Sequence, residues 1–138
     1  MMKQLKYLTL LLLVAFSGSC VDDDYDDCDM QDCVSVYPTS GSLTVKATLN
    51  SMNSSVPIRI YAGHYDDGEL ILEDTLYDER TNYVFEPGVY YSVAAKYKTE
   101  SGDITVVDGD KIEVITNTDC DTTCYTVNDA TVNCKLHY

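Results

Sequence analysis

Hydrophobic and polar residues alternate through most of the chain after residue 40. Leu43, Val45, Ala47 and Leu49 alternate with polar neighbours, and the segment 89–99 alternates in the same way. This period of two is typical of half-buried β-strands. Further short strands are predicted at 58–62, 70–72, 83–85, 104–107, 112–114 and 130–138. No segment carries the apolar spacing of an amphipathic helix, so the pattern predicts an all-β domain.

Residues 33–138 suit one small domain, and the number of strands predicts a single antiparallel β-sandwich of about seven strands. A strand precedes Pro57-Ile58-Arg59-Ile60, and Pro87-Gly88-Val89-Tyr90-Tyr91-Ser92-Val93 follows as a core strand. This order resembles the transthyretin-like or carboxypeptidase-regulatory-like domains over about half of the mature chain. The resemblance implies a fold and brings no active site with it. An immunoglobulin-like topology is the alternative.

The first 19 residues have the layout of a secretory signal peptide. Lys3 and Lys6 precede an apolar run at 7–16, and Ser17-Gly18-Ser19 supplies small residues for cleavage. As a helix this run spans only about 15 Å, half of a bilayer core. We therefore expect residues 1–19 to be removed.

Cys20 directly follows the small residues, and the segment 16–20 resembles the lipobox of bacterial lipoproteins. Ser17 stands where the common lipobox has Leu, a variation typical of the Bacteroidota. The resemblance implies that Cys20 becomes the lipidated N-terminus and anchors the protein to the membrane through its acyl chains. It implies an outer-membrane lipoprotein exposed on the cell surface, with a periplasm-facing orientation as the alternative. An ordinary secretory signal cleaved near Ser17 is the competing interpretation.

Residues 20–32 form an acidic tether between this anchor and the domain. Six of the ten residues from Cys20 to Asp29 are aspartate, and Asp32 adds another acid. Mutual repulsion and the lack of apolar residues predict a disordered, extended segment. Its position resembles the surface-export signal of Bacteroidota lipoproteins; a plain solvated spacer is the alternative. Cys28, Asp29 and Met30 interrupt the run, so it does not match a calcium-binding EF-hand loop.

The charge balance limits the partners. The full chain has a formal net charge of −14, and residues 33–138 alone hold 7 basic and 16 acidic residues. Such an acidic surface repels phosphate backbones, so we expect no nucleic-acid binding. The expected partners are the membrane, through the lipid, and a glycan or an envelope protein.

Once Cys20 is assigned to lipid, five cysteines remain. Cys28 and Cys33 precede the sandwich, and Cys120 and Cys124 follow its main strands, so two disulfides are predicted among these four. Four cysteines allow three pairings, of which cross-links from the first pair to the second are favoured. Cys134 lies on the apolar face of the last strand and is predicted to be a reduced core thiol. A four-cysteine zinc site is the alternative.

Few residues carry chemistry. His64 and His137 are both predicted to be solvated. The segments 108–110 and 119–121 each offer two aspartates, interpreted as turn residues in preference to calcium ligands. No catalytic motif is present, so we expect no enzymatic activity, no cofactor and no metal.

The chain has 12 tyrosines but only 2 phenylalanines. Tyr91, Tyr97 and Tyr138 share faces with aliphatic residues and are predicted to be core residues. Tyr61, Tyr65 and Tyr90 fall on the opposite side of their strands and form a candidate surface for sugars or proteins. Packing in the second sheet is the alternative for them. The sequence therefore predicts a lipid-anchored envelope binding module; the alternative is a structural subunit or stabilising cap of an outer-membrane or surface complex.

Overall fold

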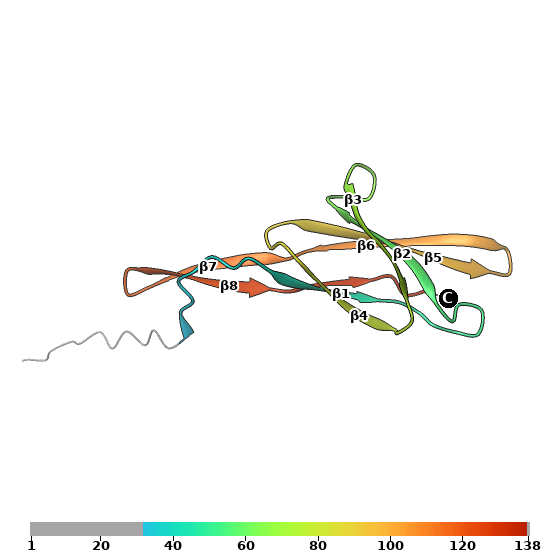
Figure 1. Ribbon diagram of the computed structural model, residues 1–138, viewed down its shortest axis with the longest axis horizontal. Coiled ribbons are helices and arrows are strands. Elements are labelled where there is room, and N and C mark those ends of the chain that lie inside the picture. Colours follow the sequence, from blue (N-terminus) through green and yellow to red (C-terminus); the bar gives the residue numbers. More distant parts are fainter. Residues whose placement is uncertain (1–31, 138) are drawn as a thin grey trace, which may run out of the picture.

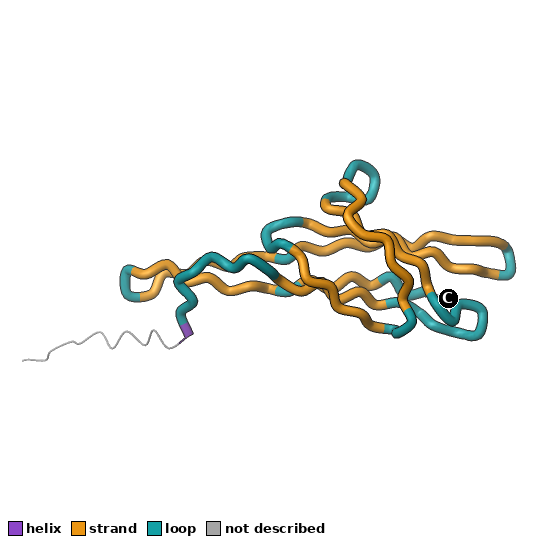
Figure 2. Tube along the Cα trace, in the orientation of Figure 1, coloured by secondary structure: helices purple, strands orange, loops and turns teal. Residues whose placement is uncertain are grey.

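The computed structural model describes residues 32–137, which form two packed β-sheets and a projecting hairpin (Figures 1 and 2). The described part of the chain holds nine strands, of which only β8 has no counterpart among the segments that the alternation predicts. They are β1 (Gly41–Lys46), β2 (Val56–Ala62), β3 (Glu69–Leu76), β4 (Arg80–Phe85), β5 (Tyr90–Thr99), β6 (Gly102–Lys111), β7 (Glu113–Asp119), β8 (Thr122–Asn128) and β9 (Ala130–Asn133).

One sheet has three strands in the order β4-β1-β9, and the other has four in the order β3-β2-β5-β6. This confirms the predicted β-sandwich. All strand pairs are antiparallel except β1 and β9, which run parallel with Leu43 opposite Ala130. The parallel pair departs from the purely antiparallel prediction. It arises because β9 returns from the projecting hairpin in the same direction as β1.

The core lies between the two sheets and follows the predicted alternation. Leu43 and Val45 of β1 are fully buried against the four-stranded sheet, which contributes Ile58, Ile60 and Val93 among others. Tyr91 and Tyr97 are buried, as predicted. The remaining buried members of the same cluster are Ala47, Val56, Leu76, Ala95, Ile112, Ala130, Val132 and Cys134.

The hydroxyl group of Tyr97 is satisfied inside this core. It donates a hydrogen bond to the carbonyl oxygen of Cys134 at 2.7 Å and accepts one from the amide of Thr48 at 3.0 Å. A buried hydroxyl without such partners would be destabilising. The tyrosine therefore links β5 to the segments that follow β1 and β9.

The segment 108–110 is not a turn, so its sequence interpretation was wrong. It continues β6 as far as Lys111. The carboxylate of Asp110 accepts a hydrogen bond from the amide of Thr131 at 2.8 Å, and that of Asp108 accepts one from the amide of Asn133 at 2.7 Å. Thr131 and Asn133 belong to β9, the edge strand of the other sheet. The two aspartates thus cap backbone donors that an edge strand would otherwise leave unpaired.

Strands β7 and β8 form a two-stranded ribbon that extends beyond the sandwich (Figure 1). No strand was predicted at β8, because four of its seven residues are Thr or Asn and only Cys124, Tyr125 and Val127 are apolar or aromatic. Cys120 and Asp121 form the turn with φ angles of 48° and 60°. Two successive positive φ angles between paired Asp119 and Thr122 match a type I′ hairpin, so the predicted turn at 119–121 is confirmed.

A disulfide joins Cys33 to Cys124 of β8 across 91 residues, with 5.0 Å between the Cα atoms. This confirms one predicted cross-link between the N-terminal and C-terminal cysteines. Cys120 is also disulfide-bonded, and its partner lies outside the described residues. Cys134 is free and buried, as predicted.

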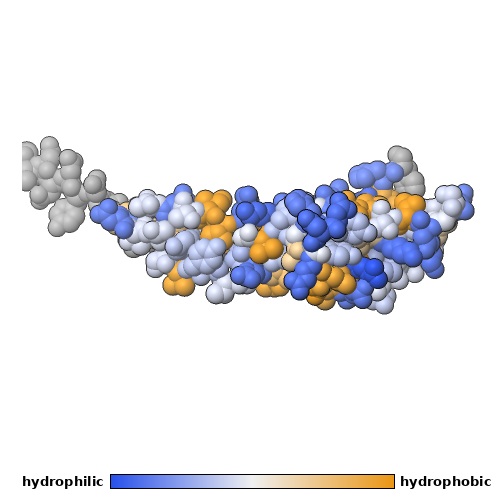
Figure 3. All heavy atoms as spheres, turned by 90° about the horizontal axis from the view of Figure 1, so that it is seen from above, coloured by the Kyte–Doolittle hydropathy of each residue, from blue (hydrophilic) through white to orange (hydrophobic). Residues whose placement is uncertain are grey.

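The signal peptide, most of the acidic tether, Cys20, Cys28 and Tyr138 lie outside residues 32–137, so their predictions stay predictions. Within the described range, no helix is long and apolar enough to cross a membrane. Exposed hydrophobic residues form small clusters separated by hydrophilic ones over the elongated body (Figure 3).

Candidate binding site

The outer face of the four-stranded sheet holds a hollow in its centre. Arg59 of β2, Ala94 of β5 and Val107 of β6 are direct cross-strand partners. Their side chains point away from the core, because Ile58, Ile60, Val93 and Ala95 occupy the alternate, inward positions. Ala94 is only 6% exposed although it faces outward, since longer side chains surround it. A small residue between long ones leaves a depression with Ala94 in its floor.

We call this depression the outer hollow. Its volume is about 470 Å³, within the range of small-molecule sites. Its lining comes from all four strands of the sheet and from the β2–β3 loop. The residues are Pro57, Ile58, Arg59, Tyr61, Tyr65, Glu73, Asp74, Thr75, Ala94, Lys96 and Thr105.

Two of the three tyrosines predicted to form a binding surface meet in this hollow. The rings of Tyr61 and Tyr65 lie 5.3 Å apart at 89°, an edge-to-face contact. Tyr65 is held there by a tight turn in the β2–β3 loop, where the amides of Asp67 and Gly68 donate to the carbonyl oxygen of His64 at 3.2 and 2.6 Å. Gly63 has a φ of 103° at the start of this turn, a conformation that L side chains rarely adopt.

Tyr90 does not line the outer hollow, although it lies on the same side of the sheet. Its ring packs against His64 with 4.4 Å between the centroids and 37° between the ring planes. It also covers Gly109 of β6 so closely that a Cβ atom there would lie 2.7 Å from the Tyr90 Cζ atom. Tyr90 is half-buried against its own sheet and the β2–β3 loop. His64 is exposed, as predicted.

Two ion pairs stand on this face. Arg59 Nε lies 2.7 Å from Glu73 Oε1, and Lys96 Nζ lies 3.0 Å from Asp103 Oδ2. All four side chains are more than half exposed, so the pairs add little stability. The charge of Glu73, its hydrogen bond and the nearby Tyr61 raise the pKa of the Arg59 guanidinium above its ordinary value.

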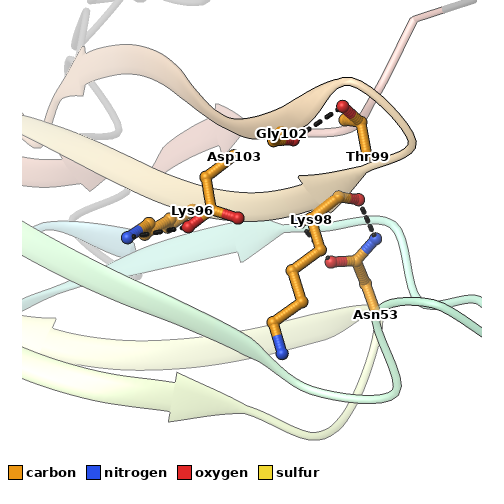
Figure 4. Close-up of polar contacts among 6 residues, drawn as sticks. All are labelled: Asn53, Lys96, Lys98, Thr99, Gly102 and Asp103. Carbon is orange, nitrogen blue, oxygen red and sulfur yellow. Dashed lines mark hydrogen bonds and ion pairs between the residues drawn. The ribbon is translucent and has the colours of Figure 1, made fainter.

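A smaller hollow of about 290 Å³ adjoins the outer hollow and shares Pro57 and Lys96 with it; we call it the end hollow. Asn53 is 4% exposed and shapes this hollow. Its amide group pairs with the backbone of Lys98, donating to the carbonyl oxygen at 3.0 Å and accepting from the amide at 2.8 Å (Figure 4). The loop 50–55 is thereby fastened to β5. Sequence reasoning treated this loop only as a break and gave no signal for Asn53.

The wall formed by β3 is tied to the other sheet. Tyr83 of β4 donates a hydrogen bond from its hydroxyl group to Asp74 Oδ2 at 2.7 Å. Burial, this hydrogen bond and the charge of Asp74 raise the pKa of Tyr83 above its ordinary value. The phenol therefore remains a donor at any physiological pH and keeps Asp74 directed toward β4.

Two kinds of candidate reactive group, a metal-binding cluster and the free thiol, can be assessed in residues 32–137. No cluster of His, Cys, Asp and Glu within residues 32–137 could hold a metal ion. Asp108 and Asp110, considered as calcium ligands, bind backbone amides instead. Burial, followed by the charge of Asp108, raises the pKa of the Cys134 thiol to about 12, so this cysteine is protonated and unreactive.

Comparison of the chain with protein-family models, with curated proteins and with solved structures finds no match. The lipoprotein and transthyretin-like resemblances therefore remain predictions from the sequence.

Proposed function

We propose that this protein is a lipid-anchored, non-enzymatic binding module of the bacterial cell envelope. It contacts a glycan or a protein partner through the outer face of the β3-β2-β5-β6 sheet. The observation that carries the proposal is the outer hollow, in which Tyr61 and Tyr65 meet above a floor that includes the small residue Ala94. Rigid aromatic rings beside polar groups in a concave site are typical of recognition surfaces.

The anchor supports this role. A lipid on Cys20 followed by an acidic tether would hold the domain at a membrane surface. The described chain begins beside the β7–β8 ribbon, at one end of the elongated molecule (Figure 1). The outer hollow lies on the face of the sandwich instead, so the anchored protein keeps it accessible. Cys20→Ala should move the protein from the membrane fraction to the soluble fraction and remove the acyl mass.

The binding role is tested with the acylated protein in detergent micelles. It is presented separately to the glycans and to the proteins of the envelope of the cells that produce it. We expect saturable binding by the wild type and its loss in Ala94→Arg, because the arginine fills the hollow without entering the core. Equal binding by both proteins would contradict the proposed site.

The alternative function, a structural subunit or stabilising cap of an envelope complex, has one observation in its favour. The ribbon end exposes Val34, Val36, Tyr37 and Ile115, and Tyr37 packs edge-on against Tyr125 of β8 with 5.2 Å between centroids. A structural role predicts a stoichiometric partner that is lost on Ile115→Asp and kept on Ala94→Arg. The opposite result supports the binding module.

A further inference from the structure

The charges around the two adjoining hollows balance, in contrast to the rest of the domain. The lining residues include three basic ones, Arg59, Lys96 and Lys98, and three acidic ones, Glu73, Asp74 and Asp103. Glu73 and Asp103 pair with Arg59 and Lys96 on this face, whereas the Asp74 carboxylate at its edge accepts the hydrogen bond from Tyr83. Residues 33–138 as a whole hold 7 basic and 16 acidic residues. Almost half of the basic side chains of the domain therefore gather at one site, where their charge is compensated.

This balance disfavours a charged ligand. An anionic ligand near Arg59 or Lys96 would also face Glu73 or Asp103, which lie 2.7 and 3.0 Å from those cations. A cationic ligand near Glu73 or Asp103 would likewise face the positive charge of Arg59 or Lys96. Displacing either partner would leave one charge without its counterion, so neither sign of ligand gains a net attraction.

The same pairs suit hydroxyl groups, which both donate and accept hydrogen bonds. The Nε bond to Glu73 uses one of the five N–H donors of Arg59, and a carboxylate has about four acceptor positions. Thr75 and Thr105, whose side chains carry hydroxyl groups, line the same hollow. Donors and acceptors thus stand side by side on an exposed wall.

The aromatic pair supplies the remaining contact. Tyr61 is half-buried and Tyr65 is exposed, and their rings are perpendicular, so the hollow presents a ring face and a ring edge together. The C–H faces of sugar rings pack on aromatic rings, whereas their hydroxyl groups need polar partners. We propose that the outer and end hollows form one site for a neutral saccharide chain; this rests on the proposed binding function.

The test is binding of the acylated protein, in detergent micelles, to a panel of immobilised polysaccharides. The neutral probes are mannan, dextran, xylan and galactan; the acidic probes are polygalacturonate and chondroitin sulfate. We expect saturable binding to at least one neutral probe, with an affinity that changes less than about twofold between low and high salt, because no net charge is neutralised.

The variants locate the site. Tyr61→Ala and Tyr65→Ala should each weaken binding about tenfold, and Ala94→Arg should abolish it. Tyr77→Ala is the matched control, since Tyr77 is 73% exposed and lines neither hollow. Far-UV circular dichroism checks that each variant folds. The two tyrosine variants keep the test valid even where Ala94→Arg does not fold.

The outcomes separate this inference from the proposed function. Binding only to acidic probes, or only to a protein partner, with sensitivity to Ala94→Arg would overturn the neutral ligand and retain the site. Glycan binding that none of the three variants changes would overturn both. No binding to any saccharide of the panel would also refute the neutral-saccharide inference.

Discussion

The two disulfides together should stabilise the domain by more than the sum of the losses that removing each one alone produces. Cys33 and Cys124 are bonded to each other, and Cys120 is bonded to a residue outside the described range. The sequence predicts Cys28 as that partner, because Cys20 is expected to carry lipid. The two bridges would then be interleaved along the chain, because Cys28 and Cys33 lie close together in sequence, as do Cys120 and Cys124. The perturbation is to replace each pair by serine, Cys33/Cys124 and Cys28/Cys120, separately and together.

The expected losses of unfolding free energy follow from the lengths of the loops that the two disulfides close. One bridge alone closes a loop across 91 residues, which the chain-entropy model values at about 4.6 kcal/mol. With that bridge in place, the second closes a ring of only about 11 residues, worth about 2.8 kcal/mol. Removing either bridge first should therefore lower the free energy of unfolding by about 3 kcal/mol. Removing both should lower it by about 7.4 kcal/mol, about 1.8 kcal/mol more than twice the single loss of about 2.8 kcal/mol and comparable to the whole stability of a small domain.

Urea unfolding monitored by far-UV circular dichroism measures these losses; the chain has no tryptophan, so tyrosine fluorescence is the second probe. The two single-bridge variants serve as controls for each other. Losses that simply add, with the double variant at twice the single value, would refute the interleaved arrangement. A loss of about 4.6 kcal/mol for one pair and none for the other would refute it as well.

Two further predictions concern buried and edge groups of the sandwich. The pKa of the Cys134 thiol is raised to about 12 by burial, so its stabilising effect is complete below the unfolded value near 9 and is lost as the pH rises toward 12. Over that range the wild type should lose up to about 1.4 kcal/mol of unfolding free energy per pH unit more than Cys134→Ala. Urea unfolding at a series of pH values measures this, and an equal pH dependence of the unfolding free energy in both proteins would contradict it. Replacing Asp108 or Asp110 by Ala removes a charge-assisted bond to β9, so each variant should lose about 1–2 kcal/mol and Asn variants less. Ala and Asn variants of equal stability would show that the carboxylates do not cap the edge.

Much of the sandwich could be predicted because burial on one face imposes a period of two. Leu43 and Val45 of β1 and Val93 of β5 occupy the core side of their strands as the alternation indicates. The prediction failed where polar groups are satisfied by distant partners. Asp108 and Asp110 have the composition of a turn, yet hydrogen bonds to residues 131 and 133 hold them in β6. Strand β8 was missed because its stability comes from β7 and a disulfide rather than from an apolar face.

The candidate site shows the same division between local and long-range causes. Alternation correctly directs Tyr61 away from the core, and a turn signal correctly ends β2 before Tyr65. The hollow itself depends on register, because Ala94 is placed between Arg59 and Val107 only by pairing with β2 and β6. A shift of one residue in either pairing would put an inward-facing side chain in that row and remove the depression. Ala94 therefore had no signal as a site residue in the sequence, although its small size leaves the depression between the tyrosines and the ion pairs.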